Sequence, residues 1–395
     1  MVLDILICTC LFICGINFKN CFRWFSKGEK TLLNYLFLWH LFFGCAYVFF
    51  NLSGNGGDAI IYWLFPKVNS FDNVIKKIIE GSPSGYIYVI NYFPSHVLSL
   101  SFFTVSMFYT LVGYFGFVFL LVIVKENIPN YNVLRKVKLF GLPIFPYMLF
   151  LPNLHFWTAG LGKDTLLFLS ITLFIYALNK LKGRLLFMAI SISISIFIRP
   201  HILLFLCMSV GLSIFFYNKV KLYWKILLSI LFVIVLVILI PRVMAFTKIE
   251  SLQASSFEKF ANTKAKKLNS SGTGSGIDIS SYSYPYKVFT FLFRPLFFDL
   301  NGVLALFASI ENLILMFFSL MVVRRNIVKG FSMGNITIKT IFLFFAIGSL
   351  VFPLILGNLG IILRQKTPFI ILFIVFGFWI LALPNQASRN ALKLR

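Results

Sequence analysis

The chain has 395 residues, of which 59% are apolar and 12% charged, and its formal net charge is +24. With a mean hydropathy of +0.90, this composition excludes a soluble domain held by one anchor and predicts a single all-α transmembrane domain over residues 1–395. In a membrane protein the excess of Lys and Arg first reports on loop orientation, so nucleic acid is not expected as a partner.

Apolar stretches recur along the chain and predict a polytopic helix bundle of about eleven transmembrane helices. These stretches are 3–17, 31–52, 97–124, 139–151, 165–178, 185–198, 202–217, 226–240, 300–323, 340–357 and 368–383. The first lacks a basic leading segment and an obvious cleavage site, so we expect a span there and not a signal peptide. The six Cys residues lie in or beside predicted spans, which indicates small apolar side chains and no disulfide or zinc framework.

Basic residues are concentrated in alternate connections between the predicted spans. Six segments carry 21 of the 36 Lys and Arg and only two acids, Glu29 and Glu126; they are 19–30, 125–138, 179–184, 218–225, 324–339 and 384–395. The positive-inside rule places them in the cytoplasm, which predicts an outer N-terminus and a cytoplasmic C-terminus. Segments 53–96 and 241–299 are then the two large outer loops. The second contains a Gly/Ser-rich stretch, 269–276, that we expect to be flexible.

Asp58 follows a run of glycines in the first outer loop. A carboxylate just beyond a span, with Tyr62 and Trp63 one turn further on, suits a general base that meets a sugar hydroxyl. Asp after glycine is also a common helix start, so an N-cap role is the alternative.

A polar segment, 153–164, is followed by an apolar hairpin that ends in Arg199. Each arm of the hairpin has 14 residues, or about 21 Å of helix against a hydrocarbon core of about 30 Å. The ends of the arms, with Lys163, Asp164, Arg199 and His201, are therefore expected to gather on one recessed side of the membrane. Asp164 would also cap the following helix, and Arg199 could simply extend to the interface.

Lys163 stands at the start of a predicted helix, where a cation opposes the helix dipole unless an anion lies between them. A phosphate group would satisfy both. Prolines 143, 146 and 152 interrupt the preceding span, and broken helices in membranes occur beside protein or watery cavities.

Three features of the C-terminal half carry charge. Arg294 and Asp299 flank a tight turn, and Glu311 lies near the middle of a span, where it needs a partner, such as His40, or a proton. Arg364 and Lys366 follow helix-breaking residues at the expected outer edge and fit a pyrophosphate or lipid headgroups.

Several short segments resemble polytopic proteins found with bacterial surface-polysaccharide genes. They are FWTAGLGKD (156–164), RPH (199–201), FRP (293–295) with EN (311–312), and NLGIILRQKTPF (358–369). Those proteins resemble O-antigen and exopolysaccharide polymerases and, more distantly, C-type membrane glycosyltransferases. The resemblance covers about residues 50–385. It implies a multi-pass enzyme of the bacterial inner membrane that acts on polyprenyl-diphosphate-linked oligosaccharides, with membrane lipids and other polysaccharide assembly proteins as partners.

The resemblance also implies roles for particular residues. Carried over by position, Arg199, Arg294 and Arg364 would bind the diphosphate and Asp58 would be the base. From their place on the predicted outer face we add Lys163 and Lys366 to the diphosphate-binding residues and Asp299 to the catalytic carboxylates, with Asp164, His201, Glu311 and Trp157 as supporting residues. No cofactor is expected, and no metal, because the segment around Asp58 lacks the second acid of C-type transferases. The glycine-spaced arginine motifs of some polymerases are also missing around Arg199 and Arg364.

Two other classes of function are possible. A lipid-linked oligosaccharide flippase would need polar residues along its spans and an internal repeat, and the sequence has few of the former and no evident repeat. A membrane acyltransferase would need a His beside an acid within a span, and His155 and His201 are not so placed.

Overall fold

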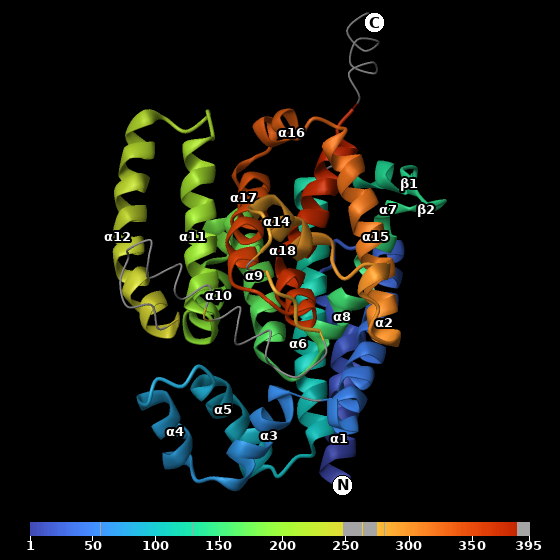
Figure 1. Cartoon of the computed structure of the whole chain (residues 1–395), viewed down its shortest axis with the longest axis vertical. Helices are drawn as coiled ribbons and strands as arrows, with labels where there is room; N and C mark the ends of the chain where they lie inside the picture. Colours follow the sequence, from blue (N-terminus) through green and yellow to red (C-terminus); the bar gives the residue numbers. More distant parts are fainter. Residues whose placement is uncertain (56, 129, 248–262, 264–274, 280, 385–395) are drawn as a thin grey trace, which may run out of the picture. The chain divides into compact units, whose positions relative to one another are not determined.

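The computed structural model describes the chain except for residues 56, 129, 248–262, 264–274, 280 and 385–395. The described part is almost entirely helical (Figure 1); its strands are the two-residue β1 (Lys138–Leu139) and β2 (Leu142–Pro143). Most of the Gly/Ser-rich stretch 269–276 and nearly all of the basic tail 384–395 lie outside the described residues.

Long apolar helices confirm a multi-pass, all-α membrane protein. Among the described residues, seven helices are long and apolar enough to span: Val2–Cys21, Lys27–Gly54, Phe102–Asn127, Lys225–Ala245, Val303–Val323, Ile336–Leu354 and Leu359–Ala382. A bent pair, Pro152–Ala159 with Lys163–Asn179, would make an eighth, and Leu185–Ile198 and Pro200–Phe215 are shorter apolar helices. The expected count of eleven and the orientation of the termini stay predictions.

The segment 139–151 differs from the predicted span. It forms β2, a single turn α7 (Ile144–Tyr147) and a 3₁₀ turn (Met148–Phe150) instead of one helix. Pro143 and Pro146 explain the difference, because each removes a backbone N–H donor and Pro146 disfavours helical geometry at the residue before it. Phe145 accordingly has an extended backbone, with φ −108° and ψ 127°.

The chain divides into two compact units, and unit 1 comprises Met1–Leu121, Pro152–Leu204 and Val237–Glu250. Its helices are α1 (Val2–Phe18), α2 (Lys27–Phe50), α3 (Asp58–Val68), α4 (Phe71–Ile79), α5 (Gly85–Tyr92), most of α6 (Phe102–Asn127), α8 (Pro152–Ala159), α9 (Lys163–Asn179), α10 (Leu185–Ile198) and the first turn of α11 (Pro200–Phe215). Figure 1 shows α3, α4 and α5 as a separate layer at the end of unit 1 that carries the N-terminus.

Polar contacts fix the ends and the packing of unit 1. The basic segment 19–30 passes into α2 through a capping box, in which the Ser26 hydroxyl accepts from the Glu29 N–H and the Glu29 carboxylate accepts from the Ser26 N–H. Asp4 of α1 accepts from the Ser101 N–H at 2.9 Å and thereby ties the start of α1 to the start of α6.

Unit 2 comprises Val122–Leu151, Phe205–Leu236 and Ser251–Arg395. Besides β1, β2 and α7 it holds the remainder of α11, the first part of α12 (Leu222–Thr247), α14 (Tyr284–Phe293), α15 (Val303–Val323), α16 (Ile327–Met333), α17 (Ile336–Val351) and α18 (Leu359–Ala382). Side chains of Asn326, Asn335 and Asn358 cap α16, α17 and α18. The described end of the second predicted outer loop pairs with the residues just before α18, because Ile277 donates to the Gly357 carbonyl at 2.9 Å.

Candidate functional site

The chain bends by 109° between α8 and α9, and three carbonyl groups at the bend accept hydrogen bonds from side chains. Hydroxyl groups bind all three: Thr110 donates to Ala159 (2.8 Å), Thr165 to Gly160 (2.5 Å) and Tyr47 to Leu161 (3.5 Å). Irregular backbone at membrane depth requires such partners, since no water is there to replace them. The break is therefore a fixed structural feature of unit 1.

Glycines let the helices around the break approach closely. A Cβ atom on Gly113 of α6 would lie 2.0 Å from the carbonyl oxygen of Thr158, and one on Gly160 would lie 2.2 Å from the Tyr47 ring. Both distances are far below a contact, so the positions require glycine. They place the polar segment directly against α2 and α6.

Lys163 is the first residue of α9, and its side chain is 8% exposed. Its ammonium donates to the Ser84 hydroxyl at 3.1 Å and lies 5.4 Å from the centre of the Tyr62 ring. Both contacts come from the segment 53–96, the first of the two predicted outer loops. The polar segment and that loop therefore meet at one end of unit 1.

Asp164 and Arg199 form a largely buried ion pair between the start of α9 and the end of α10, with Nη2 and Oδ1 3.1 Å apart and side chains 8% and 12% exposed. This contact confirms that the charged ends of the hairpin meet. Asp164 is not the N-cap of α9, however, because Gly162 holds that position and Asp164 lies in the first turn. The two arms are joined further down by Ser170, whose hydroxyl bonds to Ser191 and Ser195, one helical turn apart.

Asp58 is the first residue of α3; it is exposed and does not cap the helix through its side chain. Tyr62, one turn further along the same face, reaches Lys163. The position of α3 is fixed because Asn91 donates to the Tyr62 carbonyl at 3.0 Å and accepts from the Tyr109 hydroxyl at 2.9 Å. Burial raises the pKa of the Tyr88 phenol, and the nearby negative charge of Asp58 adds to the rise.

Besides Asp164, two of the predicted supporting residues, Trp157 and His201, lie in unit 1. Trp157 is half-buried in α8 and meets the Phe156 ring edge-on at 5.0 Å. His201 is half-buried in the first turn of α11, two residues beyond Arg199.

Arg294 and Asp299 form a second buried ion pair, in unit 2. Arg294 donates from Nε to Asp299 at 3.0 Å and from Nη1 to the Tyr282 hydroxyl at 3.2 Å, and its Nη2 completes a bidentate contact. Asp299 also accepts from the Leu296 N–H, and its hydrogen bond to Arg294 raises the pKa of the guanidinium. A carboxylate bound on both oxygens is poorly suited to act as a base, which speaks against the catalytic role predicted for Asp299.

Lys366 is buried in α18 and has three protein acceptors. Its ammonium donates to the carbonyls of Leu292 (3.0 Å) and Arg294 (3.3 Å) and to Asn312 Oδ1 (2.6 Å). An ammonium has three donors, so these contacts leave none for a diphosphate and speak against that predicted role. Arg364, two residues earlier, is half-buried in the same helix.

Glu311 and His40 have different partners from the ones we expected. Glu311 of α15 interacts electrostatically with Lys366. His40 of α2 instead pairs with His155 of α8, with the two Nδ1 atoms 3.0 Å apart.

The structure thus brings Lys163, Asp164 and Arg199 together in unit 1, and Arg294 with Asp299 and Glu311 with Lys366 in unit 2. Convergence of cations from both units on one ligand stays a prediction. The contacts from Ser84 and Tyr62 were not expected. The turn-rich sequence at 80–86 and the spacing of Tyr62 one turn after Asp58 were the available signals.

Among the described residues, no three His, Cys, Asp or Glu side chains are grouped to hold a metal ion. In comparisons with known proteins, no family model matches this chain, and no curated protein or solved structure matches it either.

Proposed function

We propose that this protein is a glycosyltransferase or polymerase that acts on polyprenyl-diphosphate-linked sugars during surface-polysaccharide assembly in the bacterial inner membrane. One observation carries the proposal: the buried Lys163 and the Arg199–Asp164 ion pair lie together at the start of α9, where a span is broken. Charged groups at membrane depth are costly and usually serve a function. Their excess positive charge in an apolar setting suits an acidic headgroup on a lipid chain.

In the proposed reaction, Lys163 and Arg199 bind the diphosphate of the donor. Asp58 removes the proton from the acceptor hydroxyl, whose oxygen then attacks the anomeric carbon of the donor sugar. The bond from that carbon to the diphosphate oxygen breaks, and polyprenyl diphosphate leaves with the electron pair. Both cations stabilise the charge that develops on it, which is often the largest catalytic contribution.

The proposed topology has about eleven crossings, an outer N-terminus and a cytoplasmic C-terminus. Two contacts within unit 1 support it. The start of α1 contacts Ser101 and Lys163 contacts Ser84, so the start of α1, the start of α9 and the first predicted outer loop lie at one end of the unit. Cys21 follows α1 in a basic segment and is exposed. In a variant in which the other five cysteines are replaced by serine, Cys21 should react with an impermeant maleimide in inverted vesicles and not in intact cells. The reverse pattern would show that the N-terminus lies on the cytoplasmic side.

Polymer formation in a deletion strain tests the function. Lys163→Gln, Arg199→Gln and Asp58→Asn should each abolish high-molecular-weight polysaccharide, while the protein stays in the membrane and a single lipid-linked repeat unit accumulates. Lys77→Gln is the matched control for the loss of one positive charge. Lys77 lies in the same predicted outer loop as Asp58, and its side chain is 38% exposed and paired with Glu80.

Two results would contradict the proposal. Polymer of wild-type length in both cation variants would remove the proposed role of the buried cluster. Accumulation of the repeat unit on the cytoplasmic leaflet only would indicate a flippase.

A further inference from the structure

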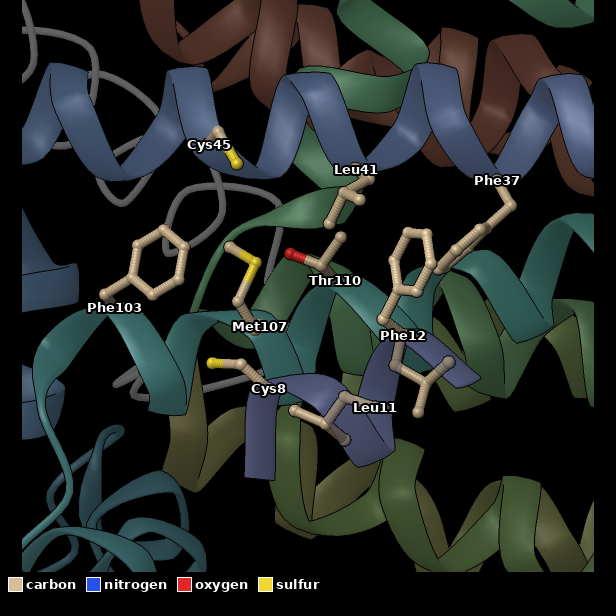
Figure 2. Close-up of a pocket in the computed structure, with 10 residues that line it drawn as sticks. Cys8, Leu11, Phe12, Phe37, Leu41, Cys45, Phe103, Met107 and Thr110 are labelled. Carbon is tan, nitrogen blue, oxygen red and sulfur yellow. The ribbon is translucent and has the colours of Figure 1, made fainter. Parts of the chain in front are cut away.

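A cavity of about 200 Å³ lies in unit 1 between α1, α2 and α6. Figure 2 shows its walls: Cys8 and Leu11 from α1, Leu41 and Cys45 from α2, and Met107 and Thr110 from α6. Thr110 provides the one hydroxyl group of the lining. Apolar cavities of about 150 Å³ in proteins stay dry and bind small hydrocarbons such as benzene, so this cavity has the size and chemistry to hold part of a hydrocarbon chain.

The cavity opens onto the exposed surface formed by α1, α2 and α6. In Figure 2 Phe103 stands at one end of the cavity and Phe12, beside Phe37, at the other, and Phe12 and Phe103 are each 41% exposed. Cys45 is exposed as well. Since α1, α2 and α6 are all long and apolar enough to span a membrane, the surface on which these residues open faces the acyl layer. A lipid chain can therefore enter from the side without crossing water.

The cavity shares a residue with the cationic cluster. The hydroxyl of Thr110 lines the cavity and donates to the Ala159 carbonyl in the α8–α9 break, four residues before Lys163. The break therefore adjoins the apolar cavity at Ala159 and leads into α9, which begins with the buried Lys163. That juxtaposition matches a lipid with an acidic headgroup and a hydrocarbon chain.

We propose that the cavity binds part of the hydrocarbon chain of the lipid-linked substrate whose diphosphate is held by Lys163 and Arg199. This assignment rests on the proposed function and names the place of the chain. It predicts that the cavity recognises the isoprenoid chain of the substrate and not the acyl chains of the surrounding phospholipid.

Photocrosslinking to the full-length protein in phosphatidylcholine vesicles tests the assignment. The probe is a polyprenyl phosphate with a diazirine in its chain, and the labelled peptides should contain the cavity residues of α1, α2 and α6. Leu41→Trp fills the cavity and should reduce labelling by at least about tenfold. The reason is that exclusion of only two methylene groups of the probe chain from the cavity already lowers its affinity by about that factor. Leu38→Trp is the matched control: Leu38 lies one turn earlier on α2, is 49% exposed and should leave labelling unchanged.

Several outcomes would overturn the assignment. Equal labelling of the two Trp variants would indicate lipid on the outer surface of α2. Equal labelling by a diazirine-tailed phosphatidylcholine, without displacement by polyprenyl phosphate, would indicate bulk lipid. Cys45→Phe fills the cavity from its exposed edge and replaces Leu41→Trp if that variant does not accumulate.

The assignment and the proposed function fail separately. Loss of polymer in Lys163→Gln together with an unlabelled cavity would reject the cavity alone. Unchanged polymer in Lys163→Gln would reject the proposed function, whatever the cavity binds.

Discussion

Two buried Arg–Asp pairs in one chain allow a matched test of which pair does chemistry. Arg199 pairs with Asp164 in unit 1, and Arg294 pairs with Asp299 in unit 2. For each pair, the Arg→Gln variant, the Asp→Asn variant and the double variant would be compared. The double variant removes both charges, so neither ion is left buried without its partner. Its Gln and Asn side chains can still form a hydrogen bond with each other.

The geometry sets the expected size of the effect. At the 3.1 Å that separates Arg199 and Asp164, the attraction is about 5 kcal/mol for an effective dielectric constant near 20. Desolvation of the two ions offsets much of it, but removal of one partner leaves the other charge buried and costs about 3–5 kcal/mol. Replacement of both is expected to cost less than about 1 kcal/mol, because no buried charge remains.

Thermal unfolding in detergent, followed by Trp fluorescence, would measure stability, and the polysaccharide pattern of complemented cells would measure function. Both double variants should recover most of the lost stability. The Arg294→Gln/Asp299→Asn protein should recover polymer formation with it, since we assign this pair to the fold. The Arg199→Gln/Asp164→Asn protein should stay inactive, because Gln cannot stabilise a departing diphosphate. Recovery of polymer in this last variant would refute the reasoning.

Three further predictions concern stability in the same unfolding assay. Thr110→Val should lower the free energy of unfolding by about 1–3 kcal/mol, since it leaves the Ala159 carbonyl in the break without its donor; an unchanged midpoint would show that the break tolerates a free carbonyl. Gly113→Ala should prevent accumulation of the protein, and Gly183→Ala, where an added Cβ meets nothing within 4 Å, should behave as wild type. Lys366→Gln should destabilise the protein by about 3 kcal/mol or more, because it disturbs three buried acceptors and removes the charge opposite Glu311; wild-type stability would reopen a ligand role for Lys366.

Features that depend on local pattern could be predicted from the sequence. Hydropathy located the long helices because every span must be apolar over its length. The short arms on either side of the basic segment 179–184 predicted that Asp164 and Arg199 would meet, since both arms have equal length and antiparallel helices return to the same level. The start of α2 was predicted too late, at residue 31, although Ser26 and Glu29 have the spacing of a capping box.

The sequence could not predict which of the Lys and Arg side chains are already bound by acceptors within the protein. Arg294, Lys366 and Arg199 all read alike in the sequence, as cations near helix ends. Only the folded chain places Asp299 against Arg294 and three acceptors around Lys366. Segment 139–151 was mispredicted for another reason, because its hydropathy suits a span while its prolines prevent a continuous helix.

Two buried lysines show how the same side chain can serve opposite purposes. Lys366 binds the carbonyls of Leu292 and Arg294 at the C-terminal end of α14, where the helix dipole favours a cation. Lys163 stands at the N-terminal end of α9, where the dipole disfavours one by about 0.3–1 kcal/mol and burial adds to the cost. The Ser84 hydroxyl and the Tyr62 ring offset part of this cost. An anion bound between Lys163 and the N–H groups of α9 would reverse the sign of this energy, and the diphosphate of a lipid-linked sugar has the charge to do so.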